Sequence, residues 1–214
     1  NSDGPTYIKN IFVDGETTTP VGIEIHNSDV VLENCASTRC KQAGFKFNNS
    51  KITLSRSAFA YRNYNLLTTT TREAGVGVGI HGVNSEITLS ALAVANETGI
   101  GDLMAYGENF MFGASRNTYG IVLDNSKLLG GVNRTSVINE NSGGRMYSEL
   151  NTSAGITLNN SIVDVKGLID IYGNYDGIKA SNSSFRFENI SVDRHSNKGI
   201  EANNSNFVFD MSAS

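Results

Sequence analysis

Apolar and polar residues alternate along most of the chain with a period of two, in short segments that begin with glycine. Examples are "GITLNNS" from Gly155, "GIEIHNS" from Gly22 and "GIVLDNS" from Gly120. Successive side chains of a strand point to opposite faces, so this period predicts strands and not helices. Each segment ends in Asn-Ser, and both residue types favour turns. The pattern therefore predicts many short strands separated by sharp corners.

The Asn-Ser pair marks an internal repeat. Its seven copies are spaced by 22, 35, 41, 35, 22 and 22 residues. The seven asparagines are Asn27, Asn49, Asn84, Asn125, Asn160, Asn182 and Asn204. A unit of 22 residues with three insertions explains these intervals, and a recurring period of this size is typical of solenoids.

Each unit holds two strands around the corner, and a third short strand follows, as in Asn189 to Val192 and Ala91 to Val94. Three short strands per 22 residues, with no helical segment, predict one turn of an all-β, single-stranded parallel β-helix. Turns that stack at about 4.8 Å give a rod of about 29 Å between the first and the last of seven turns. We expect residues 1–19 to form a lead-in and a partial coil, and residues 20–214 to form the β-helix domain.

Stacking would place the seven asparagines above one another in a column. We expect their amides to point inward and to bond to one another, because a buried unpaired polar group costs about 1 to 3 kcal/mol. The glycine that opens each segment is expected at a tight bend with positive φ.

The 22-residue coil, the stacked aliphatic positions and the asparagine column resemble right-handed parallel β-helix proteins of the pectate-lyase-like superfamily, over residues 20–210. The segment "AFAYRNYNLL" is also similar to β-helix regions of virion structural proteins from large tailed phages. The resemblance implies the fold. It leaves activity open, because the superfamily includes lyases, hydrolases, epimerases, adhesins and tailspikes.

Charge and composition exclude several partners. The formal net charge is −4 and charged residues make up 18% of the chain, so no basic field favours nucleic acid. No stretch approaches the roughly 18 apolar residues of a membrane span. The chain begins at Asn1 in the polar "NSDGPT", which suggests a processed product or a fragment of a longer protein. The two cysteines, Cys35 and Cys40, are expected to be free thiols.

Catalytic groups are not evident in the repeat. The resemblance implies an active site beside the first sheet, with clustered carboxylates, a basic residue and often calcium. A glycosidase needs two carboxyl groups roughly 5 to 10 Å apart, and no two carboxylates are adjacent in the outward positions. The histidines His26, His81 and His195 lack a metal-ligand spacing and are expected to be solvated. We therefore assign no catalytic residue, no metal and no cofactor; the charged turn "VDRHSNKG" is interpreted as a solvated turn.

The three insertions contain tyrosine and arginine side chains, residue types that are favoured at interfaces. We expect all three to lie between the third strand and the next glycine, on one face, as a recognition or assembly surface. The residues assigned to it are Tyr61, Arg62, Tyr64, Tyr106, Glu108, Arg116, Arg145, Tyr147 and Glu149.

These features favour a non-catalytic segment of a phage tail fibre or tailspike-like appendage. Its expected partners are further copies of itself, as in a homotrimer, other virion proteins, or host surface polysaccharide. The alternatives are a polysaccharide lyase or epimerase of the same fold and a bacterial adhesin. Eight asparagines match the N-glycosylation pattern, among them the column residue Asn182. A glycan on this residue, which is expected to be buried, would break the column. We therefore expect the protein at a virion or extracellular surface and not in a eukaryotic secretory route.

Overall fold

The structure, a computed structural model, describes residues 4–16, 18–54, 58–61, 77–90, 111–115, 117–132, 145–188 and 190–210. These residues form twenty-one strands and no helix. Every strand pair is parallel, as the alternating pattern and the repeat predict. The all-β prediction is thus confirmed for the described part of the chain.

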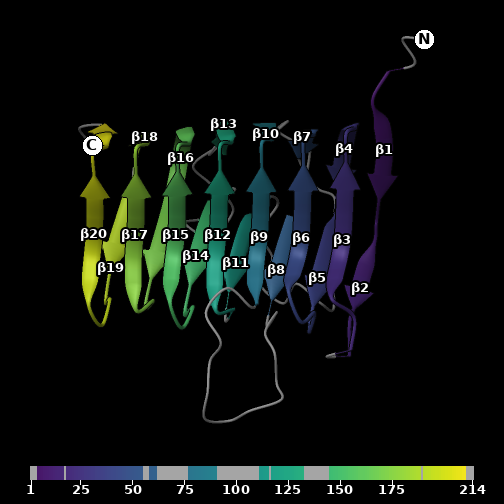
Figure 1. Cartoon of the computed structure of the whole chain (residues 1–214), viewed down its shortest axis with the longest axis horizontal. Coiled ribbons are helices and arrows are strands. Elements are labelled where there is room, and N and C mark those ends of the chain that lie inside the picture. Colours follow the sequence, from purple (N-terminus) through teal and green to yellow (C-terminus); the bar gives the residue numbers. More distant parts are fainter. Residues whose placement is uncertain are drawn as a thin grey trace, which may run out of the picture.

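The strands belong to three stacks, which we call sheets 1, 2 and 3 (Figure 1). Sheet 1 contains β3 (Val21–His26), β6 (Ala43–Asn48), β9 (Val78–Val83), β12 (Tyr119–Asp124), β15 (Ala154–Asn159), β17 (Asp176–Ser181) and β20 (Lys198–Asn203). Sheet 2 contains β1 (Thr6–Lys9), β4 (Asp29–Glu33), β7 (Lys51–Leu54), β10 (Glu86–Ser90), β13 (Lys127–Val132), the first half of β16 (Ile162–Tyr172), β18 (Ser184–Glu188) and β21 (Asn206–Asp210). Sheet 3 contains β2 (Phe12–Asp14), β5 (Cys35–Thr38), β8 (Ala58–Tyr61), β11 (Met111–Ser115), β14 (Arg145–Glu149), the second half of β16 and β19 (Ile190–Asp193).

The chain visits the sheets in the order 1, 2, 3, and we call one such set of strands a rung. The long strand β16 joins sheets 2 and 3, since it pairs with β13 through Ile162–Gly167 and with β14 through Leu168–Tyr172. Figure 1 shows the rungs following one another along the long axis, from purple β3 to yellow β20. Strands β1 and β2, from the predicted lead-in, continue sheets 2 and 3 in the same register.

One hydrophobic core is shared by all three sheets. Its buried members include Ile80 from sheet 1, Ile87 from sheet 2 and Ala114 from sheet 3. In-register stacking repeats each position, so that Ile121 lies between Ile80 and Ile156. The repeated apolar positions that the sequence predicts for the interior form this core, except at the last rung, where Phe207 is 49% exposed.

The Asn-Ser corner between sheets 1 and 2 differs from the prediction. All seven asparagines have φ between 48° and 50°, the left-handed conformation that Asn tolerates, and all seven are exposed. Two pairs of side chains bond on the surface, Asn84 to Asn49 and Asn204 to Asn182. The expected hydrogen bonds thus occur in part, but burial of these amides, including that of Asn182, was wrong.

Serine forms the inner column at this corner. The backbone N–H of Ser85 donates to Ser126 Oγ at 3.0 Å, and the N–H of Ser126 donates to Ser161 Oγ at 3.1 Å. The same bond links every successive pair from Ser28 to Ser205. Each hydroxyl in turn donates to the carbonyl two residues earlier, so donor and acceptor are both satisfied.

A buried asparagine column exists at another corner, between sheets 3 and 1. It contains Asn117, Asn151 and Asn174, each at most 1% exposed. Asn151 Oδ1 accepts from the Asn117 N–H at 3.0 Å, and Asn174 Oδ1 accepts from the Asn151 N–H at 2.9 Å. The inward amide ladder that the sequence predicted is therefore real, but it is made by other asparagines.

The repeated glycines serve close packing instead of a positive-φ bend. A Cβ on Gly155 would lie 2.7 Å from the Gly177 carbonyl oxygen and 2.7 Å from Asn174 Nδ2. The same approach recurs at Gly79 and Gly120. None of these three glycines has positive φ, so the expectation of a bend was wrong.

Candidate functional site

The insertions leave the repeat at two different corners. Residues 62–76 follow β8, between sheets 3 and 1, as predicted. Residues 91–110 and 133–144 instead lie between sheets 2 and 3, before β11 and β14. The expectation of one common face fails for these two, because β11 and β14 are the strands in register with β8. The predicted third strand at Ala91–Val94 lies outside the described residues.

The residues assigned to the insertion surface fall into two groups. Five lie outside the described residues: Arg62, Tyr64, Tyr106, Glu108 and Arg116. The other four belong to strands, since Tyr61 ends β8 and Arg145, Tyr147 and Glu149 lie in β14. Their placement in loops was wrong, because the alternation in "RMYSE" continues sheet 3.

Tyr147 is the clearest of these corrections. It is 3% exposed, and a Cβ on the neighbouring Gly113 would lie 2.8 Å from its Cδ1 atom. The ring therefore packs over Gly113, and its burial leaves little of it for a ligand.

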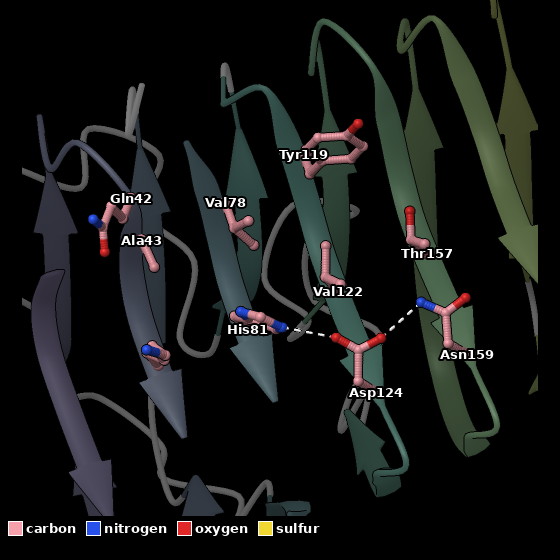
Figure 2. A pocket seen from close by; sticks show the side chains of 10 residues that line it. Gln42, Ala43, Val78, His81, Tyr119, Val122, Asp124, Thr157 and Asn159 are labelled. Atoms are coloured by element: carbon pink, nitrogen blue, oxygen red, sulfur yellow. Dashed lines mark hydrogen bonds and ion pairs between the residues drawn. The ribbon is translucent and has the colours of Figure 1, made fainter. Parts of the chain in front are cut away.

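A cleft of about 500 Å³ lies on the outer face of sheet 1, over β6, β9, β12 and β15. Figure 2 shows Val122 near its middle, with His81 on the strand to one side and Thr157 on the strand to the other. Tyr119, at the start of β12, and Asp124, at its end, complete the central strand of the lining. This volume falls in the range of small-molecule sites.

Asp124 organises the polar edge of the cleft (Figure 2). Its Oδ2 is 2.9 Å from His81 Nε2, and its Oδ1 accepts from Asn159 Nδ2 at 2.7 Å. The side chains of His81 and Asp124 are 25% and 33% exposed, so both remain open to a ligand. The three residues come from three adjacent strands, which the register holds in place.

The lysine side chains at the border of the cleft form ion pairs with carboxylates that do not line it. Lys46 Nζ lies 3.1 Å from Glu24 Oε1, and this contact holds the pKa of the Glu24 carboxyl below its ordinary value. Lys179, one strand beyond Thr157, lies 3.3 Å from Asp176 Oδ2. Asp124 is the only carboxylate among the described residues that line the cleft.

The histidines are not merely solvated. His26 Nε2 lies 3.1 Å from Glu24 Oε1, and His81 pairs with Asp124 as above. The ring nitrogens of His195 are buried and have no hydrogen-bond partner among the described residues. A Cβ on Gly177 would lie 2.8 Å from His195 Nε2, and one on Gly155 would lie 2.7 Å from Asn174 Nδ2, so His195 occupies the next position of the buried asparagine column.

The charged turn from Val192 to Gly199 does not form one site. Arg194 Nη1 donates to the Tyr172 hydroxyl at 2.8 Å, and Lys198 Nζ donates to Glu201 at 2.6 Å. Each cation thus contacts a different strand. No group of three or more His, Cys, Asp or Glu side chains suited to a metal occurs in the described ranges.

Both cysteines are buried and neither forms a disulfide, as expected. Burial is the main cause that raises the pKa of both thiols. The protonated form is therefore favoured, which makes them poor nucleophiles.

The sequence contains a signal for the cleft, but a comparison of one repeat position at a time does not reveal it. His81 lies two residues after its glycine, whereas Asp124 and Asn159 lie four residues after theirs. The contact is therefore diagonal between neighbouring strands, and only a comparison of both columns would reveal it.

Among the described residues, no helix is long and apolar enough to cross a membrane. The sequence matches no protein-family model, and it matches no curated protein. The site must therefore be interpreted from its own geometry.

Proposed function

We propose that the chain is a rigid, non-catalytic segment of an extracellular appendage, such as a phage tail fibre or tailspike, with its rungs closed into a right-handed parallel β-helix. The observation that carries this proposal is the unbroken serine column from Ser28 to Ser205, which ties every rung to the next. Such a stack resists bending, because any displacement of one rung breaks bonds to both neighbours. Its partners would be further copies of the chain, as in a homotrimer, and other virion proteins.

Immunogold electron microscopy tests this role. Antibody raised against the purified chain would be applied to phage particles, and to uninfected cells, from the strain that carries the gene. Label on the tail or its fibres is the expected result. Label on uninfected cells would replace the proposal with the bacterial adhesin.

The proposed recognition or assembly role is kept for the insertion residues outside the described ranges, which are Arg62, Tyr64, Tyr106, Glu108 and Arg116. Replacing Tyr64 and Tyr106 with serine should weaken subunit association or binding to host polysaccharide, measured by analytical ultracentrifugation and by cell binding. Unchanged behaviour in both assays would reject this role.

A polysaccharide-active enzyme is the second candidate, because the His81–Asp124 pair is a combination that can move protons. Incubation with host-type polysaccharides would reveal it as shorter products or as new unsaturated ends. Loss of that activity in Asp124→Asn would assign the reaction to the cleft. Loss in Glu108→Gln or Glu149→Gln would assign it to those carboxylates instead.

A further inference from the structure

We propose that the cleft on sheet 1 binds the side chain of an arginine from a partner protein, with the aliphatic stem on Val122 and the guanidinium on the Asp124 carboxylate. This inference goes beyond the structural role and does not depend on it. An appendage that binds no arginine could still be a rigid stack, and a chain that is absent from phage particles could still bind one.

The floor of the cleft is an apolar position in an otherwise polar column. Equivalent outward positions of sheet 1 carry Glu24, Lys46, His81, Val122, Thr157, Lys179 and Glu201. Val122 is the only aliphatic residue among them. Two residues along a strand span about 7 Å, so Asp124 lies about one arginine stem beyond Val122 on β12. An alkyl chain that ends in a cation can therefore cover Val122 and reach Asp124.

Asp124 presents its carboxylate to this floor. His81 Nε2 lies 2.9 Å from Oδ2, and Asn159 Nδ2 donates to Oδ1 at 2.7 Å. Figure 2 shows these contacts at the two outer sides of the carboxylate, whose oxygens both face Val122. Each oxygen has a further lone pair, so both can accept a second hydrogen bond from the cleft. Two parallel N–H groups of a guanidinium match this arrangement, which favours arginine over lysine.

The surrounding charges leave Asp124 without a permanent cation. Asn159 is neutral, and His81 carries a charge only when it is protonated. Lys46, the only lysine among the described residues that line the cleft, lies 3.1 Å from Glu24 Oε1 instead. A cation from a partner protein would therefore offset the charge of Asp124, whereas an acidic ligand would be repelled.

An NMR titration of the full chain tests the proposal, with acetyl-glycyl-arginyl-glycinamide as the probe. The same peptide with citrulline is the matched control, because citrulline has the shape of arginine without its charge. We expect the amide signals of His81, Val122 and Asn159 to shift and saturate, with affinity at least about fivefold higher for the arginine peptide than for the citrulline peptide. A lysine peptide should bind more weakly than the arginine peptide, because it lacks the fork of donors.

Asp124→Asn should lower the affinity for the arginine peptide to that of the citrulline peptide. Asp29→Asn removes an exposed carboxylate of β4, in sheet 2, and should bind like the parent chain although it changes the net charge equally. Thermal unfolding checks that both variants are folded, and the comparison of peptides on the parent chain decides the question if Asp124→Asn is not. The proposal is overturned if the arginine peptide does not saturate up to about 50 mM, or if the citrulline or lysine peptide binds as tightly. Normal binding by a folded Asp124→Asn also overturns it.

Discussion

At the scale of single residues, backbone conformation explains why asparagine recurs at the corner of each repeat better than burial does. The asparagine of each Asn-Ser corner has φ near +50° and an exposed side chain. Asn is chosen there because it accepts the left-handed conformation, while the following serine supplies the inner hydrogen bonds.

Asn160→Leu tests this assignment. Leucine has no local hydrogen bond that compensates for positive φ, so we expect a loss of about 1 kcal/mol in the free energy of unfolding. Asn160→Gly should be nearly neutral, because glycine adopts this conformation without strain. Urea unfolding measures both. A loss of equal size in the glycine variant would instead assign the stability to the amide.

His195 stands where the buried asparagine column would continue with another asparagine. Its ring nitrogens are buried without partners, at the position that follows Asn174. His195→Asn should restore an amide that can bond to the column, and we expect a gain of about 1 to 2 kcal/mol in unfolding free energy. His26→Asn, at an exposed position, is the control. A destabilised His195→Asn would show that the imidazole is needed there.

At the scale of elements, the period-two pattern predicted the strands correctly wherever the repeat is unbroken. It failed beside the insertions, because a short alternating stretch such as Ala91–Val94 fits a strand as well as β11 does. Pairing across rungs decides between them, and pairing depends on residues that are far apart in sequence. For the same reason the sequence does not predict the cleft, whose His81–Asp124 contact runs diagonally between two neighbouring strands.

The close approach of sheet 1 strands makes glycine necessary. In Gly155→Ala the new methyl group would lie 2.7 Å from the Gly177 carbonyl oxygen. The strands must separate to accept it, and we expect a loss of about 1 to 3 kcal/mol. Gly131→Ala, where the nearest atoms lie 3.4 Å away, should cost less. Equal losses measured by thermal unfolding would contradict this explanation.

At the scale of the whole molecule, the free energy of unfolding should fall at alkaline pH because of the two buried thiols. Burial raises the pKa of Cys35 and Cys40, so the folded chain keeps protons that the unfolded chain releases. Their contribution is present below the unfolded thiol pKa of about 8.5 and is lost as pH rises above it. We expect the urea midpoint to fall above that pH in the parent chain and to fall less in a Cys35→Ala, Cys40→Ala double variant. An identical decline in both would exclude the thiols as its cause.

The central claim is that the rungs form one continuous stack that is tied together by the serine column. Hydrogen exchange followed by NMR on the full chain tests it most directly, at the backbone N–H groups of Ser50, Ser85, Ser126, Ser161 and Ser183. The stack predicts that these five amides exchange together and slowly, only when the whole structure opens. Fast exchange at these turn residues, or protection that stops between two rungs, would contradict it.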